Sequence, residues 1–565
     1  MNIAPAVSTL RAAEQAAPLI EVRGLRVAFG QRGEQLAVKD VSFVLPRGRC
    51  LAIVGESGSG KSVTARSLIG LAGRNARVSA ERLRIGGRDV IGQPERAWRA
   101  LRGKSIGYVL QDALVSLDPL KRVGDEVTEG LWVHGAVRRA ERTARAADLL
   151  RLVGVPDPEL KARQLPHELS GGQRQRALIA AALALDPEIL IADEPTTALD
   201  ATIQAQILAL LDDICARGKT LVLISHDLAV VSRMADEVMI MRHGEVVEHG
   251  AAEEVFREPR HAYTRALIDA VPSAHSRGAR LAPADAKRFH PQSSALAVAR
   301  LDDERKTAPG PLLVAEGLVK SFSRPDGSVS TVVRDVSFTI GRGEALGIVG
   351  ESGSGKSTVA RLVLALETPD AGGVSLDGKA WSSLTEAERR PRRRDISVVY
   401  QDPFSHFDPR WTVERIIADA LPPTDDRRTR TARVGELLDL VGLPERFRDR
   451  LPLELSGGQR QRAAIARAIA PGAKLIVCDE PVSALDVSIQ AQVLDLLADL
   501  RDQLGVGYLF ISHDLGVVHH LCDRVLVLKA GQVVELGTSD NVFLHPRHPY
   551  TRELVAAVPR LGARP

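Results

Sequence analysis

The stretch that decides the fold is LAIVGESGSGKS, residues 51–62, in which a short apolar run leads into a glycine-rich loop that ends in lysine and serine. It fits the pattern G-x-x-x-x-G-K-[ST], which joins a strand to a helix. The glycines let backbone N–H groups wrap a phosphate, and the helix N-terminus adds partial positive charge. The stretch therefore predicts an α/β fold built around a phosphate-binding loop, or P-loop.

The chain carries this stretch twice, because LGIVGESGSGKS returns over residues 346–357. The motif ELSGGQRQRA begins at Glu168 and again at Glu454, and an apolar run ending in Asp-Glu-Pro also occurs twice, in the same order. Motifs kept in order indicate two copies of a whole domain rather than a short solenoid repeat. We predict an N-terminal extension over residues 1–18, P-loop NTPase domains over 19–272 and 312–565, and a linker over 273–311.

The segments around the motifs support this fold class. Short apolar runs such as CLAIV, EILIA and TLVLI are typical of parallel strands covered on both faces. The predicted linker is rich in Ala, Ser, Pro and charge, which indicates a flexible connection between two domains.

Composition excludes several classes of protein. The 565 residues are 44% hydrophobic and 26% charged, with a net charge of +4, which is typical of a soluble globular protein and gives no support to nucleic-acid binding. The four cysteines form no C-x-x-C pair, which argues against a disulfide framework or a zinc cluster. No apolar run is long enough to cross a bilayer. We expect a soluble, intracellular protein that needs another subunit if it works at a membrane.

The two P-loops and the two Asp-Glu pairs predict phosphoryl chemistry. Lys61 would reach the β- and γ-phosphates, while Ser62 and Asp193 would hold Mg²⁺. Glu194, one residue further on, would orient or deprotonate an attacking water. An isolated Asp-Glu at a strand end is usually a helix cap or a solvated pair, and the neighbouring P-loop is what favours catalysis. The second copy repeats the set as Lys356, Ser357, Asp479 and Glu480.

LSGGQ followed by Arg-Gln-Arg resembles the signature of ABC-type ATPases, and the resemblance extends through both halves. It implies a helical subdomain in each domain (hereafter cassette) and a head-to-tail intramolecular dimer in which the signature helix of one cassette contacts the γ-phosphate bound by the other. An ordinary serine-capped helix explains one copy of LSGGQ, but not the fixed motif order around it. The resemblance further implies that His226 and His513 act as γ-phosphate switches, that Gln111 and Gln401 sense Mg²⁺, and that Asp200 and Asp486 lie in the loop that crosses the dimer interface. It also implies that Phe29 and Phe322 stack on adenine, although an aromatic residue here is also compatible with a core position.

These inferences give a complete list of predicted site residues. The catalytic residues are Glu194, Glu480, His226 and His513. The metal contacts are Ser62, Gln111, Asp193, Ser357, Gln401 and Asp479. The nucleotide contacts of the first copy are Phe29, Gly55, Glu56, Ser57, Gly58, Ser59, Gly60, Lys61, Ser62, Gln111, Ser170, Gly171, Gly172 and Gln173. Those of the second copy are Phe322, Gly350, Glu351, Ser352, Gly353, Ser354, Gly355, Lys356, Ser357, Gln401, Ser456, Gly457, Gly458 and Gln459.

Two further segments narrow the resemblance. QDALVSLDP after the first copy's glutamine and QDPFSHFDP after the second's are similar to the oligopeptide/dipeptide/nickel importer ATPases. So are the tails VFREPRHAYTRAL, residues 255–267, and VFLHPRHPYTREL, residues 542–554. The resemblance implies ATP hydrolysis that drives import through two permease subunits, with a solute-binding protein outside, at the cytoplasmic face of the inner membrane.

The chain departs from those relatives in two ways. Ala262 stands in the first tail where the second has Pro549. Many relatives carry a cysteine cluster after the tail that binds an iron–sulfur centre, and none of the four cysteines lies there, so we expect ATP and Mg²⁺ but no cluster.

One alternative belongs to another functional class. Soluble tandem-cassette proteins also act on ribosomes, but they typically carry a long, charged helical linker and an arginine after the His-Asp pair. Here the linker contains Pro and Gly, and the pair is followed by Leu228 and Leu515. The sequence favours the importer and two competent ATP sites. It leaves open the kinetic equivalence of those sites and the solute, which could be a dipeptide, an oligopeptide, a glutathione-like peptide or a nickel chelate.

Overall fold

The computed structural model describes residues 18–30, 35–111, 116–197, 199–273, 276–282, 310–323, 327–422, 426–559 and 561. These form two compact units, which are described separately. The first comprises Met1–Leu199, Ile203–Ile268 and Pro559–Pro565, and the second Asp200–Thr202 and Asp269–Val558.

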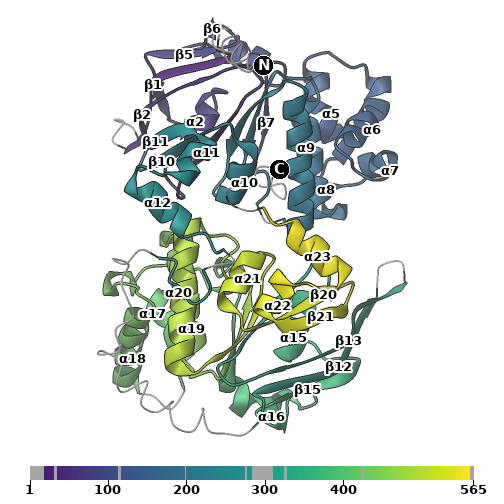
Figure 1. Ribbon diagram of the computed structural model, residues 1–565, viewed down its shortest axis with the longest axis vertical. Helices are drawn as coiled ribbons and strands as arrows, with labels where there is room; N and C mark the ends of the chain where they lie inside the picture. Colours follow the sequence, from purple (N-terminus) through teal and green to yellow (C-terminus); the bar gives the residue numbers. More distant parts are fainter. Residues whose placement is uncertain are drawn as a thin grey trace, which may run out of the picture. The chain divides into compact units, whose positions relative to one another are not determined.

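The first unit is built on a sheet whose strand order is β6-β5-β1-β2-β11-β10-β3-β9-β8-β7, with β4 paired to β1 (Figure 1). Neighbouring strands from β10 to β7 run parallel, whereas β1 pairs antiparallel with β2, β4 and β5. The strands are β1 (Ile20–Phe29), β2 (Gln35–Leu45), β3 (Cys50–Val54), β4 (Arg77–Ser79), β5 (Arg82–Ile85), β6 (Arg88–Asp89), β7 (Ile106–Val109), β8 (Ile189–Asp193), β9 (Thr220–Ile224), β10 (Glu237–Arg242) and β11 (Glu245–Ala251).

Helices cover this sheet, and α5 to α8 pack on one another as a helical subdomain. The helices are α2 (Lys61–Ser67), α3 (Glu95–Leu101), α5 (Val123–Val133), α6 (Arg142–Leu152), α7 (Pro158–Arg163), α8 (Gly171–Leu183), α9 (Ala201–Ala216), α10 (Leu228–Met234), α11 (Ala252–Arg257) and α12 (Ala262–Asp269).

The second unit repeats the plan as a four-stranded sheet, β13-β12-β15-β16, and a six-stranded sheet, β17-β18-β19-β14-β20-β21. Its strands are β12 (Leu313–Ser323), β13 (Val329–Ile340), β14 (Ala345–Val349), β15 (Ala371–Leu376), β16 (Lys379–Ala380), β17 (Ile396–Val399), β18 (Leu475–Asp479), β19 (Gly507–Ile511), β20 (Arg524–Lys529) and β21 (Gln532–Thr538).

Its helical subdomain contains α17, α18 and α19, and α19 runs beside α20 (Figure 1). The helices are α15 (Lys356–Val363), α16 (Glu386–Arg389), α17 (Val413–Ala418), α18 (Arg427–Leu440), α19 (Gly457–Ile469), α20 (Val487–Leu504), α21 (Leu515–Leu521), α22 (Ser539–Leu544) and α23 (Pro549–Ala556). The predicted α/β fold with two P-loop domains, each with a helical subdomain, is confirmed.

The parallel strands form the buried centre of each unit. Every residue of β3, β9 and β14 is buried, as expected for strands covered on both faces. Each P-loop leaves the carboxyl end of a central strand: β3 lies between β10 and β9, and β14 between β20 and β19. In open parallel sheets, ligands bind beyond these carboxyl ends, so the fold places the loops where a nucleotide can reach them.

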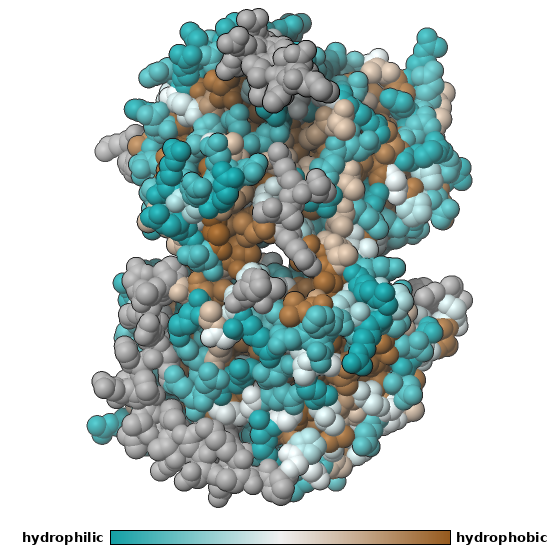
Figure 2. Space-filling model, in the orientation of Figure 1, coloured by the Kyte–Doolittle hydropathy of each residue, from teal (hydrophilic) through white to brown (hydrophobic). Residues whose placement is uncertain are grey.

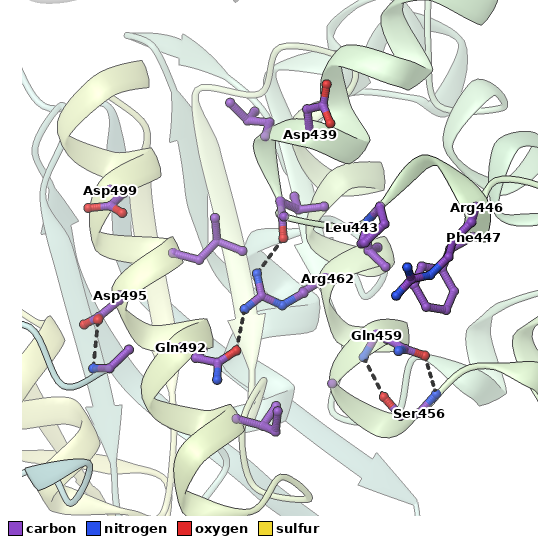
Figure 3. A pocket seen from close by; sticks show the side chains of 18 of the residues that line it. Asp439, Leu443, Arg446, Phe447, Ser456, Gln459, Arg462, Gln492, Asp495 and Asp499 are labelled. Atoms are coloured by element: carbon purple, nitrogen blue, oxygen red, sulfur yellow. Dashed lines mark hydrogen bonds between the residues drawn. The ribbon is translucent and has the colours of Figure 1, made fainter. Parts of the chain in front are cut away.

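Part of the predicted linker packs on the second unit. Leu281 is only 3% exposed, and its backbone N–H and that of Ala282 donate to the two carboxylate oxygens of Asp495 on α20, at 3.1 and 3.0 Å. Arg280 forms an ion pair with Asp499 at 2.9 Å. Figure 3 shows Asp495 and Asp499 on α20. The matching position of α9, counted from the shared Gln-Ala-Gln, is Ala209, so only the second cassette carries this carboxylate.

We predict that Asp495→Ala lowers the free energy of unfolding by about 1–3 kcal/mol, because it leaves buried N–H groups without their acceptor. The change should also expose Arg280 to faster cleavage by trypsin. Denaturant unfolding and limited proteolysis of the full chain measure the two effects. Asp502→Ala is the control, since Asp502 lies on the same helix with its side chain 73% exposed, and it should change stability by less than about 0.5 kcal/mol. Indistinguishable behaviour of the two variants would contradict the proposed anchoring.

Candidate nucleotide-binding sites

The P-loop of the first cassette depends on glycines in the left-handed region. Gly55, Gly58 and Gly60 have φ values of +153°, +79° and +101°. A Cβ on Gly55 would lie 2.2 Å from the carbonyl oxygen of Met241, and one on Gly60 would lie 2.6 Å from that of Ala37. Both distances are far inside van der Waals contact, so only glycine lets the loop approach its neighbours this closely.

The second P-loop has the same geometry. Gly350 and Gly355 have φ values of +151° and +103°. A Cβ on Gly350 would lie 2.2 Å from the carbonyl oxygen of Leu528. Both copies of GESGSGKS therefore fold into the same tight loop at the start of a helix.

The P-loop lysine lies across its own loop. The Lys61 ammonium donates to the carbonyl oxygens of Gly55 and Glu56 at 2.7 and 2.8 Å. Lys356 does the same with Gly350 and Glu351, at 2.8 Å each. Each ammonium is thereby held in the concave side of the loop, where a phosphate would be wrapped.

A serine in each loop has an unsatisfied hydroxyl. Ser59 and Ser354 are each 4% exposed, and neither Oγ has a hydrogen-bond partner among the described residues. A buried polar group without a partner is unfavourable by about 1–3 kcal/mol. Phosphate oxygens would satisfy such hydroxyls, so the loops have the chemistry expected of a phosphate site.

Hydroxyl and carboxylate oxygens meet beside each P-loop. Ser62 Oγ donates to Asp193 Oδ1 at 3.0 Å, and Asp193 is fully buried. In the second cassette Ser357 Oγ donates to Asp479 Oδ1 at 3.4 Å. Hard oxygen donors of this kind suit Mg²⁺, which usually takes one or two protein ligands and completes its shell with water and phosphate.

Glu194, the residue after the buried aspartate, lies in one cluster with the predicted residues His226 and Gln111 and with Thr197. Glu194 Oε2 lies 3.2 Å from His226 Nδ1 and accepts hydrogen bonds from Gln111 Nε2 at 3.1 Å and Thr197 Oγ1 at 3.0 Å. Glu194 itself has a φ of +52°, a left-handed conformation that is uncommon outside glycine. Such strain gathers at functional sites because the surrounding structure must hold it.

Electrostatics keep this glutamate ionised. Burial acts to raise the pKa of Glu194, but His226, Thr197 and Lys61 outweigh burial and lower it to about 2. Burial acts to lower the pKa of His226, and the facing Glu194 carboxylate outweighs it and raises that pKa. The cluster therefore favours a carboxylate facing an imidazolium, which leaves the carboxylate free of a proton.

The second cassette reproduces the cluster. Glu480 lies 3.1 Å from His513 Nδ1 and accepts from Gln401 Nε2 at 2.9 Å. Its φ is +49°. Burial acts to raise the pKa of Glu480, but His513 and Lys356 outweigh it and the pKa is lowered. Both cassettes thus hold a complete cluster.

The signature residues cap a helix in each cassette. The N–H of Gln173 donates to Ser170 Oγ at 3.4 Å, and the Ser170 N–H donates to Gln173 Oε1 at 3.2 Å, which forms a capping box. A Cβ on Gly172 would lie 2.6 Å from the Ile203 side chain, so glycine allows α8 and α9 to approach closely. Figure 3 shows the same pair of bonds between Ser456 and Gln459 at the start of α19.

The two predicted adenine-stacking residues lie on the antiparallel strands. Phe29 ends β1, and its ring lies 3.2 Å from the position of a Cβ on Gly73. Phe322, on β12, is 37% exposed, with the Lys320 ammonium 5.5 Å from its ring centre. Their contact with adenine stays a prediction.

Sequence reasoning missed residues that support these clusters through long-range contacts. Tyr108 Oη on β7 donates to Asp193 Oδ2 at 2.7 Å. The matching residue on β17 is Val398, so Asp479 has no such partner from that position. The tyrosines of the two tails, Tyr263 and Tyr550, accept hydrogen bonds from P-loop N–H groups. Two features of the sequence could have pointed to these contacts. One is the tyrosine in IGYV where the second copy has ISVV, and the other is the presence of the tail in both copies.

Comparison with known proteins places this geometry in a family. The family model "ABC transporter" matches residues 38–197 and 333–483. The chain belongs to this ABC transporter family. The model "Oligopeptide/dipeptide transporter, C-terminal region" also matches it twice, at residues 247–291 and 534–564. The chain is therefore an ATP-binding and ATP-hydrolysing transport subunit of the oligopeptide/dipeptide type.

Similar proteins cover nearly the whole chain. The glutathione import ATP-binding protein GsiA of Salmonella paratyphi A is 42% identical over 557 residues, which is 96% of this chain and 89% of that protein. The oligopeptide transport ATP-binding protein OppD of Mycobacterium tuberculosis is 41% identical over 606 residues, covering 96% and 98%. A solved dimeric ATP-binding cassette in a post-hydrolysis state with ADP and Pi is 30% identical, covers 40% of this chain and 98% of that one, and has a TM-score of 0.38.

On the face drawn in Figure 2, hydrophilic residues cover most of each unit. Among the residues that the structure describes, no helix combines the length and apolar character needed to cross a membrane.

We predict that Gly60→Ala weakens ATP binding by roughly 5- to 150-fold, because its Cβ would strike a backbone carbonyl and overpacking costs roughly 1–3 kcal/mol. Gly58→Ala is the matched control, since it has the same sign of φ but no atom within 4 Å of the added Cβ. Equilibrium ATP titration of the two full-length variants measures the difference. Equal losses in both would show that close packing at Gly60 is not what shapes the loop.

Proposed function

We propose that this chain binds ATP at two sites and couples its hydrolysis to the import of peptides or related small solutes. The observation that supports two working sites is the complete cluster in each cassette: P-loop lysine, an aspartate at the end of a central strand, a glutamate whose pKa is lowered, histidine and glutamine. Family membership supports transport, and the paired tail matches support the peptide type.

Each residue has a distinct role in the proposed reaction. The P-loop N–H groups, Lys61 and Ser59 bind the β- and γ-phosphates, and Ser62 and Asp193 hold Mg²⁺. When bound there, Mg²⁺ would supply positive charge that offsets the negative charge of the phosphates. Glu194 orients the attacking water and accepts its proton, a role that requires the unprotonated form which the low pKa provides.

The histidine and glutamine fix that glutamate. His226 and Gln111 both lie within hydrogen-bond distance of the same oxygen, Glu194 Oε2. When the γ-phosphate is bound, His226 Nε2 is free to face it while Nδ1 keeps the glutamate in place. The second cassette performs the same steps with Lys356, Ser354, Ser357, Asp479, Glu480, His513 and Gln401.

We propose further that each ATP is completed by the signature helix of the other cassette. The exposed N-termini of α8 and α19 offer backbone N–H groups and partial positive charge to a γ-phosphate. ATP then favours a closed state, because it adds contacts that only this state can make, and hydrolysis removes them.

Partners follow from the proposed transport role. Among its relatives, one protein is named for glutathione import and another for oligopeptide transport. We propose that this chain docks, as a peripheral subunit on the cytoplasmic face of the inner membrane, on two permease subunits, and that a solute-binding protein delivers the cargo outside.

We predict that Glu194→Gln and Glu480→Gln each sharply reduce ATP turnover and that the double variant loses at least about 100-fold, since a removed general base typically costs 10²–10⁴-fold. Phosphate release measures turnover, and the shift of the melting temperature on adding ATP measures retained binding. Glu188→Gln is the control, because Glu188 directly precedes β8 and is 57% exposed. Full turnover in the double variant would refute the catalytic assignment.

A separate experiment tests the partners. The tagged full chain, extracted with mild detergent from native membranes, should bring down two integral membrane proteins in equal amounts. Its ATPase rate in that complex should rise when solute and binding protein are added. Recovery of ribosomal subunits instead would contradict the transport role.

A further inference from the structure

The tail motif has the same local structure in both cassettes. In the first, the backbone N–H groups of Arg260 and His261 donate to the Glu248 carboxylate on β11, at 2.8 and 3.1 Å. The His261 Nδ1 then accepts from the N–H of Tyr263 at 3.1 Å and caps α12. A strand glutamate and a tail histidine therefore fix where the tail helix begins.

The second tail forms the same hydrogen bonds, although its sequence differs at several positions. Glu535 on β21 accepts from the N–H groups of Arg547 and His548 at 2.9 and 3.1 Å, and His548 Nδ1 accepts from the N–H of Tyr550 at 3.2 Å. Figure 1 shows α22 and α23 beside β20 and β21. The change from Pro549 to Ala262 leaves the arrangement intact.

This arrangement buries the tail tyrosine and aims its hydroxyl at the P-loop. Tyr263 is 7% exposed, and its Oη accepts a hydrogen bond from the backbone N–H of Glu56 at 3.2 Å. Tyr550 is 3% exposed, and its Oη accepts from the N–H of Glu351 at 3.1 Å. Burial raises the pKa of Tyr550 to about 12, so the phenol is neutral under working conditions.

A cation from the neighbouring strand covers each ring. The Arg242 guanidinium lies 4.7 Å from the ring centre of Tyr263, and the Lys529 ammonium lies 4.4 Å from that of Tyr550. Both distances are within the range of a cation–π contact, which adds to the burial that fixes the ring. Burial and the cation therefore fix the position of each tyrosine ring, and with it the position of the hydroxyl.

The two hydrogen-bonded N–H groups lie at the point where each loop is packed most tightly. Glu56 follows Gly55, whose missing Cβ leaves room for the carbonyl of Met241, the residue before Arg242. The carboxyl end of β10 therefore contacts both parts. The Met241 carbonyl packs against the loop at Gly55, and the Arg242 guanidinium lies over the Tyr263 ring. The second cassette has the same arrangement at β20. The Leu528 carbonyl packs against Gly350, the residue before Glu351, and the Lys529 ammonium lies over the tyrosine ring.

We propose that Tyr263 and Tyr550 are positioning residues for the P-loops, so that each tail is a working part of its own ATP site. This inference rests on the proposed role of the P-loops in binding ATP. The phenol oxygen accepts the N–H at the entrance of the loop and so fixes the point where the loop leaves its strand. A loop fixed in this way loses less conformational freedom when ATP binds.

Linkage gives this proposal a second consequence. If the tail stabilises the ATP-binding conformation of the loop, ATP must stabilise the docked tail by the same free energy. ATP binding should therefore slow hydrogen exchange in α12 and α23. A tail that serves only to hold the fold together would exchange at the same rate with and without ATP.

The test uses the full chain in the Glu194→Gln/Glu480→Gln background, so that ATP survives the titration. Adding Tyr263→Phe and Tyr550→Phe together should raise the Kd for Mg·ATP roughly three- to tenfold, the effect of one neutral hydrogen bond at each site. The same change should abolish the ATP-dependent slowing of exchange in the tail helices. The rings remain, so their packing is kept.

Tyr508→Phe is the matched control, because the Tyr508 hydroxyl donates to the Leu497 carbonyl at 3.0 Å in a fully buried position away from the loop. It should lower the melting temperature and leave the Kd unchanged. An unchanged Kd in the tail variants, or an equal rise with Tyr508→Phe, would overturn the proposal. Lys61→Ala with Lys356→Ala should abolish binding, and full binding in that variant would overturn the P-loop assignment itself.

Discussion

The structure depends on one constraint: the P-loop must present its backbone N–H groups to a phosphate while packed against the end of a neighbouring strand. That packing leaves no room for a side chain at Gly55 or Gly350, where a carbonyl oxygen stands 2.2 Å from the place of a Cβ. The loop therefore needs a central strand behind it, β3 or β14, and a parallel neighbour beside it, β10 or β20. The parallel arrangement of the central strands provides that neighbour, and it also lets helices cover the apolar strands on both faces.

The two clusters of predicted catalytic residues are alike at the glutamate, histidine and glutamine and differ at the aspartate before the glutamate. Glu194 and Glu480 share the left-handed backbone, the histidine and the glutamine. The aspartates before them differ. Asp193 is fully buried and accepts from Tyr108, whereas the position of Tyr108 is Val398 in the second cassette, and burial with the adjacent Glu480 raises the pKa of Asp479. The two copies therefore share the residues that are proposed to act on phosphate and differ in the residues that contact the aspartates.

The sequence predicted the parts of this molecule that depend on local motifs. A P-loop motif fixes a strand, a turn and a helix within one short stretch, so its fold could be predicted, and the clusters around Glu194 and Glu480 followed from motif order. The bonds from Tyr108 to Asp193, from Tyr263 to Glu56 and from Leu281 to Asp495 could not be predicted. Each joins residues far apart in the chain, and hydrogen bonding of that kind depends on how side chains pack rather than on any local pattern.

The contact between tail and loop also gives a physical reason why the tail occurs twice. If each P-loop is supported by the tyrosine of its own cassette, one tail cannot serve both sites, and fusing two cassettes must keep the first tail inside the chain. The chain must then continue from α12 toward the second cassette. It does so with Arg280, Leu281 and Ala282 packed on α20, where Asp495 receives two N–H groups and the matching residue of α9 is Ala209. Asp495 thus holds the segment that follows the first tail, and α9 has no carboxylate at the matching position.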